Sequence, residues 1–386
     1  MISVDEALQA VFALADPLPP ETVPLRHAAG RVLAAPITAT RSQPPFRASV
    51  MDGYAVSGDH SAYSVTGESA AGHGFDGVLG AGQAIRIFTG APLPEGATRV
   101  VIQEDVTREG DRITLSENAD TQPYIREIGT DFRAGQTIGS PRRLTPADVA
   151  LSASMNVPEI TVSRRPSVAL IATGDELVMP GEDPGADQII ASNTFGLAAM
   201  LEDEGAVPRL LPIARDTKAS LEAAFELAAG ADLVVTIGGA SVGDHDLVGE
   251  VAASLGMERA FYKIAMRPGK PLMAGRLGRT PMIGLPGNPV SSMVCGHIFL
   301  RPMLRAMQGL PAAPLPSRTA TLAAPIRQNG PREHYMRAVL DHDRITPAER
   351  QDSSLLTVLS GANALILRPP GAPAADVGET VTYLDF

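Results

Sequence analysis

The sequence has little of several residue types, and each shortage excludes a class of function. Cysteine occurs once, as Cys295, so an internal disulfide and a metal site built from clustered cysteines are both excluded. Tryptophan is absent and aromatic residues make up 4% of the chain, which argues against stacking platforms for single-stranded nucleic acid. The net charge is −11, whereas a nucleic-acid-binding surface is basic. No run of 18 apolar residues occurs, so we expect no membrane span.

The residues that are present have the composition of a soluble globular protein, with 44% of them hydrophobic. A length of 386 residues exceeds that of a typical single domain, so we expect two or three domains. The first six residues lack the basic and apolar segments of a secretory signal peptide. We therefore expect a cytoplasmic protein that binds a small molecule and neither nucleic acid nor a membrane.

The first part of the chain combines a helix with a long β-rich stretch. Ser3 and Glu6 have the spacing of a capping box, and apolar residues follow at helical spacing, which predicts an N-terminal helix. From about residue 46 to 140, short β-type runs alternate with glycine and proline turns, which predicts a mostly β insertion. Thr145 and Pro146 then match the start of another helix.

Strand and helix patterns alternate from Ser167 onward. The expected strands are 167–171, 209–213, 233–237, 261–265 and 282–285, and the expected helices are 193–204, 218–229, 246–255 and 290–307. This alternation predicts a doubly wound α/β sheet with helices on both faces. After a proline-rich linker at 311–316, four further β-type runs predict a small β domain or barrel.

Three polar loops, at 173–176, 238–246 and 285–289, fall at the expected carboxyl ends of strands, where sheets of this kind bind ligands. The middle loop contains Gly238, Gly239 and Gly243, whose backbone can approach a ligand closely. Its amides are suited to hold a phosphate, and Asp246 at the next helix start is suited to hold a divalent metal. The pattern predicts a site for a phosphate and a metal ion.

A basic turn at 266–271 carries Arg267 and Lys270 between two prolines, which suits two cations that face an oxyanion. Any bound metal is expected to be a hard cation held by oxygen atoms, because cysteine and metal-type histidine motifs are missing. Turn capping or plain solvation is the simpler interpretation of each single carboxylate. The carboxylates next to glycines or at expected strand ends are Asp52, Asp131, Glu176, Asp216 and Asp246.

Other motifs fit less well. Residues 239–243 match the G-x-S-x-G pattern of serine hydrolases, but the following helix is expected about five residues after Ser241. The P-loop pattern and the G-x-G-x-x-G dinucleotide pattern do not occur. Met293 and Cys295 lie at helical spacing and are expected in the core.

Six motifs occur in an order that is characteristic of one family. They are Ser-Val-Met-Asp-Gly-Tyr-Ala at 49–55, Thr-Gly-Ala-Pro-Leu-Pro at 89–94, Thr-Gly-Asp-Glu-Leu at 173–177, Gly-Gly-Ala-Ser-Val-Gly-Asp-His-Asp at 238–246, Arg-Pro-Gly-Lys-Pro at 267–271 and Leu-Pro-Gly-Asn-Pro at 285–289. On these motifs the chain resembles the molybdopterin molybdenumtransferase family, which includes MoeA and the gephyrin E domain. The resemblance covers essentially the whole chain.

This resemblance implies a homodimer of four-domain subunits. An α/β domain similar to molybdopterin adenylyltransferase would comprise 1–26 and 166–309, a connecting domain 27–45 and 141–165, a β-rich insertion 46–140, and a C-terminal β-barrel 310–386. The implied reaction inserts molybdate into adenylylated molybdopterin and releases AMP with the help of Mg²⁺. The implied protein partners are the molybdopterin adenylyltransferase and acceptor molybdoenzymes.

The resemblance also assigns roles to residues. It implies metal ligation by Glu176 and Asp246, and it implies that Asp52 and Thr89 complete the cleft of the partner subunit. The implied catalytic positions are Asp52, Thr89, Asp131, Glu176, Asp216 and Asp246. The implied positions for the adenylylated pterin are Thr173, Gly174, Asp175, Gly238, Gly239, Ser241, Gly243, Pro286, Gly287, Asn288 and Pro289. The implied positions for molybdate are Arg267, Lys270, Pro271, Ser291, Arg337 and Ser353.

Four departures from the family pattern bear on these roles. Arg267 stands where lysine is usual, Thr130 where glutamate is expected, Asp352 where glycine is common, and Ser192 with Asn193 replaces an Asp-Thr/Ser-Asn sequence. A molybdopterin adenylyltransferase and a non-catalytic scaffold are the alternative functions. The basic turn and the extra β domains argue against the first, and the retained acidic residues argue against the second.

Overall fold

The computed structural model describes residues 1–239 and 247–386. The chain divides into two compact units, one formed by residues 1–21 and 163–386 and the other by residues 22–162. The larger unit holds an α/β domain and the C-terminal strands. Within the described ranges, no helix is both long and apolar enough to cross a membrane.

The α/β domain is built on one six-stranded sheet with the order β18-β15-β19-β23-β22-β20. The four strands from β18 to β23 run parallel, and β22 and β20 complete the sheet in antiparallel orientation. The strand bounds are β15 Ser167–Ala172, β18 Val207–Leu210, β19 Leu233–Ile237, β20 Met257–Tyr262, β22 Met273–Leu277 and β23 Thr280–Leu285. The central strands are buried on both faces, as the apolar run Leu233–Ile237 predicts.

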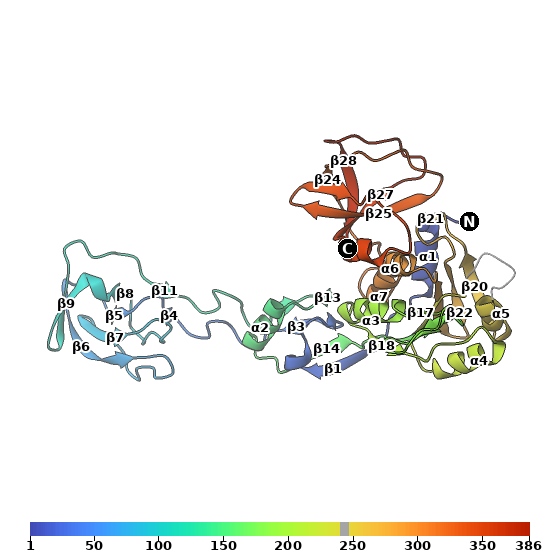
Figure 1. Ribbon diagram of the computed structural model, residues 1–386. Coiled ribbons are helices and arrows are strands. Elements are labelled where there is room, and N and C mark those ends of the chain that lie inside the picture. Colours follow the sequence, from blue (N-terminus) through green and yellow to red (C-terminus); the bar gives the residue numbers. More distant parts are fainter. Residues whose placement is uncertain (240–246) are drawn as a thin grey trace. The chain divides into compact units, whose positions relative to one another are not determined.

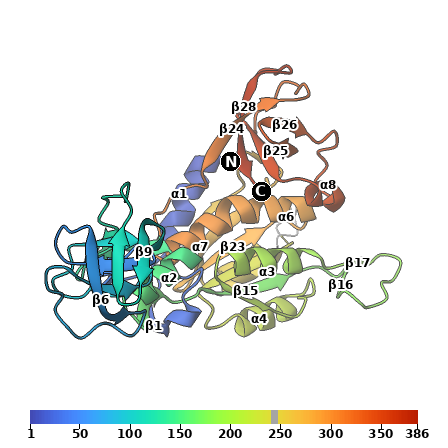
Figure 2. The same cartoon turned by 90° about the vertical axis from the view of Figure 1, so that its left-hand side faces the viewer.

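Helices cover both faces of this sheet (Figures 1 and 2). The helix bounds are α1 Val4–Leu14, α3 Asn193–Asp203, α4 Lys218–Leu227, α5 Leu247–Ser254, α6 Pro289–Cys295 and α7 Arg301–Met307. One apolar core lies between the sheet and α1, α3, α6 and α7, and a second lies between the sheet and α4 and α5. The predicted doubly wound α/β architecture is confirmed. Cys295 is fully buried in the first core, as predicted, and burial raises the pKa of its thiol.

The antiparallel edge differs from the prediction. The strand expected at 261–265 lies earlier, at Met257–Tyr262, and the strand Met273–Leu277 was not expected. Met257–Tyr262 is an edge strand in which a single side chain is buried, so it lacks the apolar pattern of a buried strand. Gly275 interrupts the other strand, and a Cβ there would collide with the Glu258 carbonyl. Close pairing of β20 with β22 therefore depends on Gly275, a residue type that in a sequence usually indicates a turn.

The long helix expected at 290–307 consists of three consecutive segments. A π-helical stretch, Gly296–Leu300, separates α6 from α7. Pro302 has no amide hydrogen, so regular hydrogen bonding cannot continue through the first turn of α7. The segment is buried along its length, which explains why its apolar pattern predicts one helix.

The C-terminal strands form a closed five-stranded barrel, which confirms the predicted barrel. β25 pairs with β26 on one side and with β27 on the other, so no edge is left between them. The bounds are β24 Ser317–Leu322, β25 Glu333–Asp341, β26 Arg344–Pro347, α8 Leu356–Ser360, β27 Ala364–Arg368 and β28 Thr380–Asp385. The short strand β21 (Met266–Arg267) adds to the outside of β25 and joins the basic turn to the barrel.

The unit at 22–162 contains a six-stranded sheet with the order β8-β5-β7-β6-β10-β9. Its strands are β5 Gly53–Val56, β6 Ala62–Ser69, β7 Gln83–Ile87, β8 Arg99–Ile102, β9 Val106–Glu109 and β10 Arg112–Leu115. A second sheet holds β1 Pro20–Pro24, β14 Glu159–Ser163, β2 Val32–Leu33 and β13 Arg142–Arg143. Helix α2 (Pro146–Ser154) begins with a capping box of Thr145 and Asp148. Two-stranded pairs link β11 Ile125–Arg126 with β4 Ala48–Ser49, and β12 Thr137–Ile138 with β3 Ile37–Thr38.

Candidate functional site

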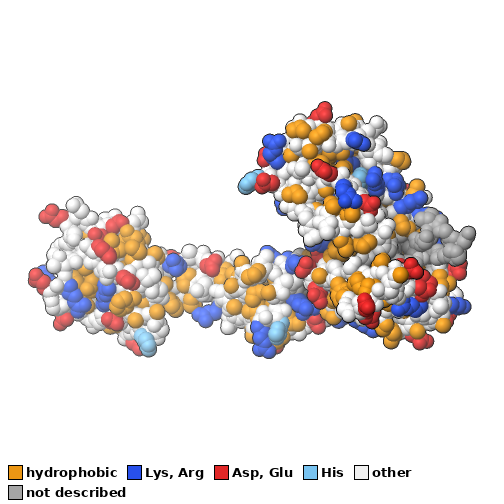
Figure 3. Space-filling view, in the orientation of Figure 1, with side chains coloured by type: hydrophobic (Ala, Val, Ile, Leu, Met, Phe, Trp, Pro, Cys, Tyr) orange, Lys and Arg blue, Asp and Glu red, His pale blue; other side chains and the backbone are white. Residues whose placement is uncertain are grey.

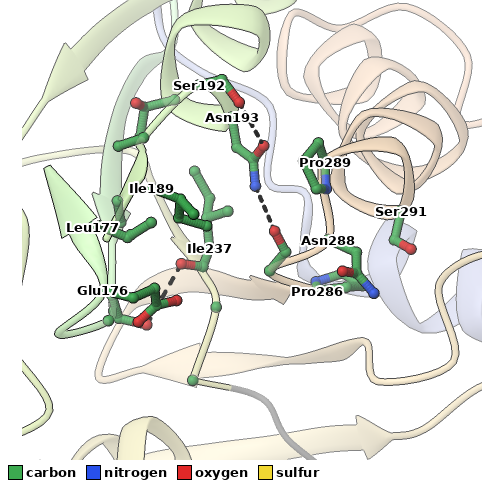
Figure 4. A pocket seen from close by; sticks show the side chains of 18 of the residues that line it. Glu176, Leu177, Ile189, Ser192, Asn193, Ile237, Pro286, Asn288, Pro289 and Ser291 are labelled. Atoms are coloured by element: carbon green, nitrogen blue, oxygen red, sulfur yellow. Dashed lines mark hydrogen bonds between the residues drawn. The ribbon is translucent and has the colours of Figure 1, made fainter. Parts of the chain in front are cut away.

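A pocket of about 810 Å³ lies at the carboxyl ends of the parallel strands (Figure 4). The chain passes from β15 to β18 on one side and then returns to β19 on the other side of β15. This reversal creates a crevice between the ends of β15 and β19, where doubly wound sheets bind ligands. Residues from the ends of both strands, Ala172 to Gly174 and Ile237 to Gly239, line the pocket.

The three polar loops singled out in the sequence meet at this pocket. The residues predicted for substrate, catalysis or molybdate that line it are Thr173, Gly174, Glu176, Asp216, Gly238, Gly239, Pro271, Pro286, Gly287, Asn288, Pro289 and Ser291. The middle loop is only partly described, because Ser241, Gly243 and Asp246 lie outside the described residues. Their assigned roles therefore stay predictions.

Glycine is required where the strand ends approach each other. Gly239 has φ +66°, and a Cβ there would lie 2.9 Å from Thr173 Oγ1 and collide with the Val248 side chain. Gly238 has φ +96°, and a Cβ there would lie 2.7 Å from the Thr173 carbonyl oxygen. Side chains at these positions would be both strained and blocked, so the two glycines keep the backbone open to the pocket.

Arg215 holds the loop after β15. Its Nη1 donates to the carbonyl oxygens of Asp175 and Leu177 at 3.0 Å each and to that of Gly174 at 3.4 Å. The Asp216 backbone N–H donates to Asp175 Oδ1 at 3.1 Å. Asp175 therefore supports the loop from outside and does not line the pocket. The clamp fixes the backbone on both sides of Glu176, whose carboxylate does line it.

Asn193 is a site residue that the sequence reveals only as a departure from the family pattern. Its Nδ2 donates to the Gly287 carbonyl oxygen at 2.7 Å, and Ser192 beside it also lines the pocket (Figure 4). The bond connects the start of α3 to the loop at 286–289. Apolar lining comes from Leu177, Ile189 and Ile190, none of which has a sequence signal that marks it as a pocket residue.

Two residues of the predicted molybdate set, Pro271 and Ser291, line the pocket, whereas Arg267, Lys270, Arg337 and Ser353 do not. The structure nevertheless connects this second group to the pocket wall. The Val290 backbone N–H, one residue before Ser291, donates to the Ser353 carbonyl oxygen at 3.1 Å. Gly269 of the basic turn packs so closely on the Cys295 sulfur that no Cβ would fit. The basic turn and the 353 segment are thus both attached to α6.

Arg337 is fully buried, and its Nε and Nη1 atoms have no hydrogen-bond partner. Its Nη2 donates to the Asp352 carbonyl oxygen at 3.1 Å. Burial, together with the nearby charge of Arg267, lowers the pKa of the Arg337 guanidinium to about 10. The Asp352 carboxylate accepts hydrogen bonds from the backbone N–H and the hydroxyl of Ser354, at 2.9 and 2.7 Å. The departure at 352 therefore adds a carboxylate whose charge opposes the shift of the Arg337 pKa, but this carboxylate makes no hydrogen bond to the free Arg337 nitrogens.

In the unit at 22–162, Asp52 and Thr89 lie together. Thr89 donates to Asp52 Oδ1 from its backbone N–H at 2.7 Å and from its hydroxyl at 3.0 Å. These two bonds hold the pKa of the exposed Asp52 carboxyl below its usual range. Asp131 donates its backbone N–H to the Gln43 carbonyl oxygen and has no bond to this pair. The Thr130 hydroxyl donates to the Glu127 carbonyl oxygen at 2.6 Å, so it closes a local turn.

Among the described residues, three carboxylates line the pocket: Glu176, Asp216 and Glu250. Oxygen atoms of this kind suit Mg²⁺, which commonly takes one or two carboxylates and completes its shell with substrate phosphates and water. Among the described residues, no three metal-ligating side chains form a cluster. The donor set therefore fits a metal that is held jointly with a phosphate-bearing ligand.

Comparison with known proteins gives one consistent result. Three family profiles match the chain: the MoeA N-terminal region (domain I and II) over residues 2–156, a probable molybdopterin binding domain over 169–306, and the MoeA C-terminal region (domain IV) over 319–386. Molybdopterin molybdenumtransferase 2 of Mycobacterium tuberculosis is 36% identical over the full length of both chains. The molybdopterin molybdenumtransferase of a Nostoc species is 33% identical over 100% of this chain and 94% of the relative.

Solved structures agree with these sequence matches. The molybdopterin biosynthesis MoeA protein from Pyrococcus horikoshii aligns over 100% of both chains, with a TM-score of 0.86 and 25% identity. A second structure of a molybdopterin biosynthesis MoeA protein from Pyrococcus horikoshii aligns over 100% of this chain and 99% of its own, with a TM-score of 0.85 and 29% identity. The resemblance seen in the six motifs is thereby confirmed, and the chain belongs to the MoeA family of molybdopterin molybdenumtransferases.

Proposed function

We propose that this chain is a molybdopterin molybdenumtransferase that inserts molybdate into adenylylated molybdopterin and releases AMP. The observation that carries the proposal is the pocket at the reversal point of the sheet, attached through α6 to an arginine with free, buried nitrogens. One region suits a phosphorylated pterin and the other suits a tetrahedral dianion. A transferase that joins these two substrates needs both regions next to each other.

The glycine-rich loops are the proposed site for the pyrophosphate of the adenylylated pterin. Gly238 and Gly239 allow the backbone to approach the phosphates without a side chain between them. Thr173 offers a hydroxyl at the same edge, although that hydroxyl lies 3.5 Å from the Ile237 carbonyl oxygen in the structure. The loop at 286–289, held by Asn193, forms the opposite wall.

Mg²⁺ is the proposed metal cofactor. Glu176 and Asp246 would hold it, and Asp216 would assist by orienting a bound water or the metal shell. When bound, the metal would neutralise charge on the phosphates of the departing AMP. The side chains of the protein would fix the position of the phosphates and hold two anionic substrates close together despite their repulsion.

Molybdate is the proposed ligand of Arg267, Lys270, Arg337 and Ser353, with Pro271 and Ser291 at the shared wall. Arg337 supports this assignment, because a buried guanidinium with free nitrogens is unfavourable until an anion pairs with it. The arginine at position 267 keeps the positive charge that the family usually supplies as lysine, and it adds a planar fork of donors.

The remaining assignments extend the proposal. The enzyme is a cytoplasmic homodimer in which Asp52 and Thr89 of one subunit complete the pocket of the other, and Asp131 is a further catalytic position. It receives its substrate from a molybdopterin adenylyltransferase and passes its product to acceptor molybdoenzymes. The four domains follow the boundaries given above from the sequence.

Adding the purified chain to adenylylated molybdopterin with and without molybdate tests this function. We expect AMP release that requires both molybdate and a divalent metal. AMP release without molybdate would contradict molybdenum transfer, and formation of adenylylated molybdopterin from ATP and molybdopterin would instead identify an adenylyltransferase. Removing the metal with EDTA and restoring it with Mg²⁺ tests the proposed metal in the same assay.

A further inference from the structure

A row of cationic side chains crosses three strands at one end of the C-terminal barrel. His334 of β25 is directly opposite Arg267 of β21 and directly opposite Arg368 of β27. Opposite residues on paired strands place their side chains on the same face, with Cβ atoms about 5 Å apart. Figure 3 shows blue side chains gathered on the part of the barrel next to β21. Neither His334 nor Arg368 lies in any of the six motifs.

His334 and Arg368 belong to the interior face of the barrel. Alternate residues of the same strands, Ala338 on β25 and Ala364 and Ile366 on β27, form the barrel core. Tyr335 points to the other face and packs in the core of the α/β domain. The His334 and Arg368 side chains therefore lie at one end of the barrel interior, and neither lines the pocket at the ends of β15 and β19.

Both side chains are buried and incompletely bonded. His334 is 6% exposed and Arg368 is 7% exposed, yet His334 Nε2 and Arg368 Nε have no hydrogen-bond partner. The only side-chain bond of Arg368 among the described contacts runs from Nη2 to the Pro373 carbonyl oxygen. Across the described residues, neither side chain has a carboxylate in an ion pair. Leaving such groups unpaired costs free energy that a bound anion would recover.

The charges that shift the pKa of His334 are those of four arginines. Burial and the charges of Arg267, Arg337, Arg332 and Arg368 together lower the pKa of His334 to about 4. A neutral imidazole donates one hydrogen bond without adding charge, and the guanidinium of Arg368 donates in a planar fork that matches two oxygens of an oxyanion. The chemistry that complements this end of the barrel is a small dianion.

We propose that His334 and Arg368 form a second anion site at the end of the C-terminal barrel, which binds a small tetrahedral oxyanion beside Arg267. Molybdate and phosphate share this chemistry and are the two sources that the experiment separates. The site lies next to the residues proposed for molybdate but depends on different side chains. The proposed anion site does not depend on transferase activity, because it is defined by anion binding alone.

Calorimetric titration of the full chain with sodium molybdate, and separately with sodium phosphate, tests the site. Arg368→Met removes the guanidinium at nearly constant length, and His334→Phe removes the ring nitrogens. Each change is expected to weaken one anion-binding event about ten- to a hundredfold, the range for a lost hydrogen bond to a charged group. Arg344→Met, which removes an exposed arginine of β26, is the matched control and should bind as the unaltered chain does.

A second measurement does not depend on the variants' folding. In the unaltered chain, a bound dianion stabilises the charged imidazole and should raise the pKa of His334, which NMR titration of the ring reports. A shift with molybdate alone assigns the site to molybdate, and a shift with both anions assigns it to tetrahedral oxyanions in general. The proposal is overturned if neither anion moves the His334 resonance, or if Arg368→Met and His334→Phe both fold and bind the anions unchanged.

Discussion

Gly239 is the residue at which a single added methyl group tests the pocket. The change Gly239→Ala places a Cβ against Val248 and Thr173, at a φ of +66° that alanine adopts only with strain. We expect the loop to shift into the pocket and the molybdate-dependent release of AMP to fall more than about tenfold, with a loss of about 1–2 kcal/mol in the free energy of unfolding. Activity and denaturant unfolding measure the two effects.

Gly256→Ala is the control for this prediction. Gly256 has φ +88°, but a Cβ there meets nothing within 4 Å, so the variant carries the backbone strain without the collision. Gly256→Ala should lose stability from the backbone strain alone and Gly239→Ala somewhat more, and only Gly239→Ala should lose activity. Equal activity in the two variants would mean that the space beside Thr173 is not used by the substrate.

The buried His297 should make the stability of the folded chain depend on pH. It is 2% exposed, and burial and the charge of Arg301 lower the pKa of its ring from 6.5 to about 4, while Glu204 opposes the shift. Between these two pH values the unfolded chain binds more protons at this residue than the folded chain does. The protein therefore has its full stability with respect to His297 above pH 6.5, and its free energy of unfolding falls as the pH drops toward 4. The slope from this group approaches about 1.4 kcal/mol per pH unit.

His297→Phe keeps a ring next to Phe386, whose centroid lies 5.0 Å away, and removes the titrating nitrogens. Urea unfolding at several pH values between 6.5 and 4 should therefore show a shallower loss of stability in the variant than in the unaltered chain. His342→Gln, at an exposed turn, is the control and should leave the slope unchanged. An unaltered slope in His297→Phe would show that other groups govern the acid sensitivity.

At the scale of structural elements, the loop after β15 depends on one side chain from the neighbouring connection. Arg215→Met would leave three carbonyl oxygens, those of Gly174, Asp175 and Leu177, without their shared donor. We expect Glu176 to lose its fixed position, because both sides of its backbone are released. The KM for the adenylylated pterin should rise about tenfold, with a smaller change in stability because Arg215 is exposed.

Arg209→Met provides the matched comparison for the loop. Arg209 also donates to backbone carbonyl oxygens, those of Leu227 at 2.7 Å and Ala229 at 3.1 Å, but they end helix α4 away from the pocket. Steady-state kinetics of both variants should separate them. If Arg209→Met raises KM as much as Arg215→Met does, the effect comes from general loosening of the domain.

The elements also show where sequence reasoning succeeds. Buried parallel strands such as Leu233–Ile237 carry a continuous apolar signal, and their carboxyl ends identify the polar loops of the site. The antiparallel edge has no such signal, because edge strands are partly exposed and one of them contains Gly275. Strand register is a property of the folded sheet. No sequence pattern could therefore place His334 opposite Arg368, or give Arg215 its three acceptors.

At the scale of the whole molecule, the predicted catalytic residues belong to both compact units. Asp52 and Thr89 lie in the unit at 22–162, whereas Glu176 lies in the unit that contains the pocket. Asp52 is exposed, and its two hydrogen bonds from Thr89 favour the ionised carboxylate. In the proposed homodimer this pair completes the pocket of the other subunit. Variants that are inactive for different reasons should then complement each other in a mixed dimer.

Two inactive variants should restore activity when they share a dimer. Asp52→Ala removes a residue that each subunit contributes to the pocket of its partner, and Glu176→Ala removes a residue of the subunit's own pocket. In a mixed dimer, one of the two pockets receives both intact residues, so random exchange should return about a quarter of the activity of the unaltered protein. Mixing Asp52→Ala with Thr89→Ala should restore nothing, because every pocket then receives a damaged donor. Differently tagged subunits report whether mixed dimers have formed. If they form without recovery of AMP release, each pocket is completed by its own chain.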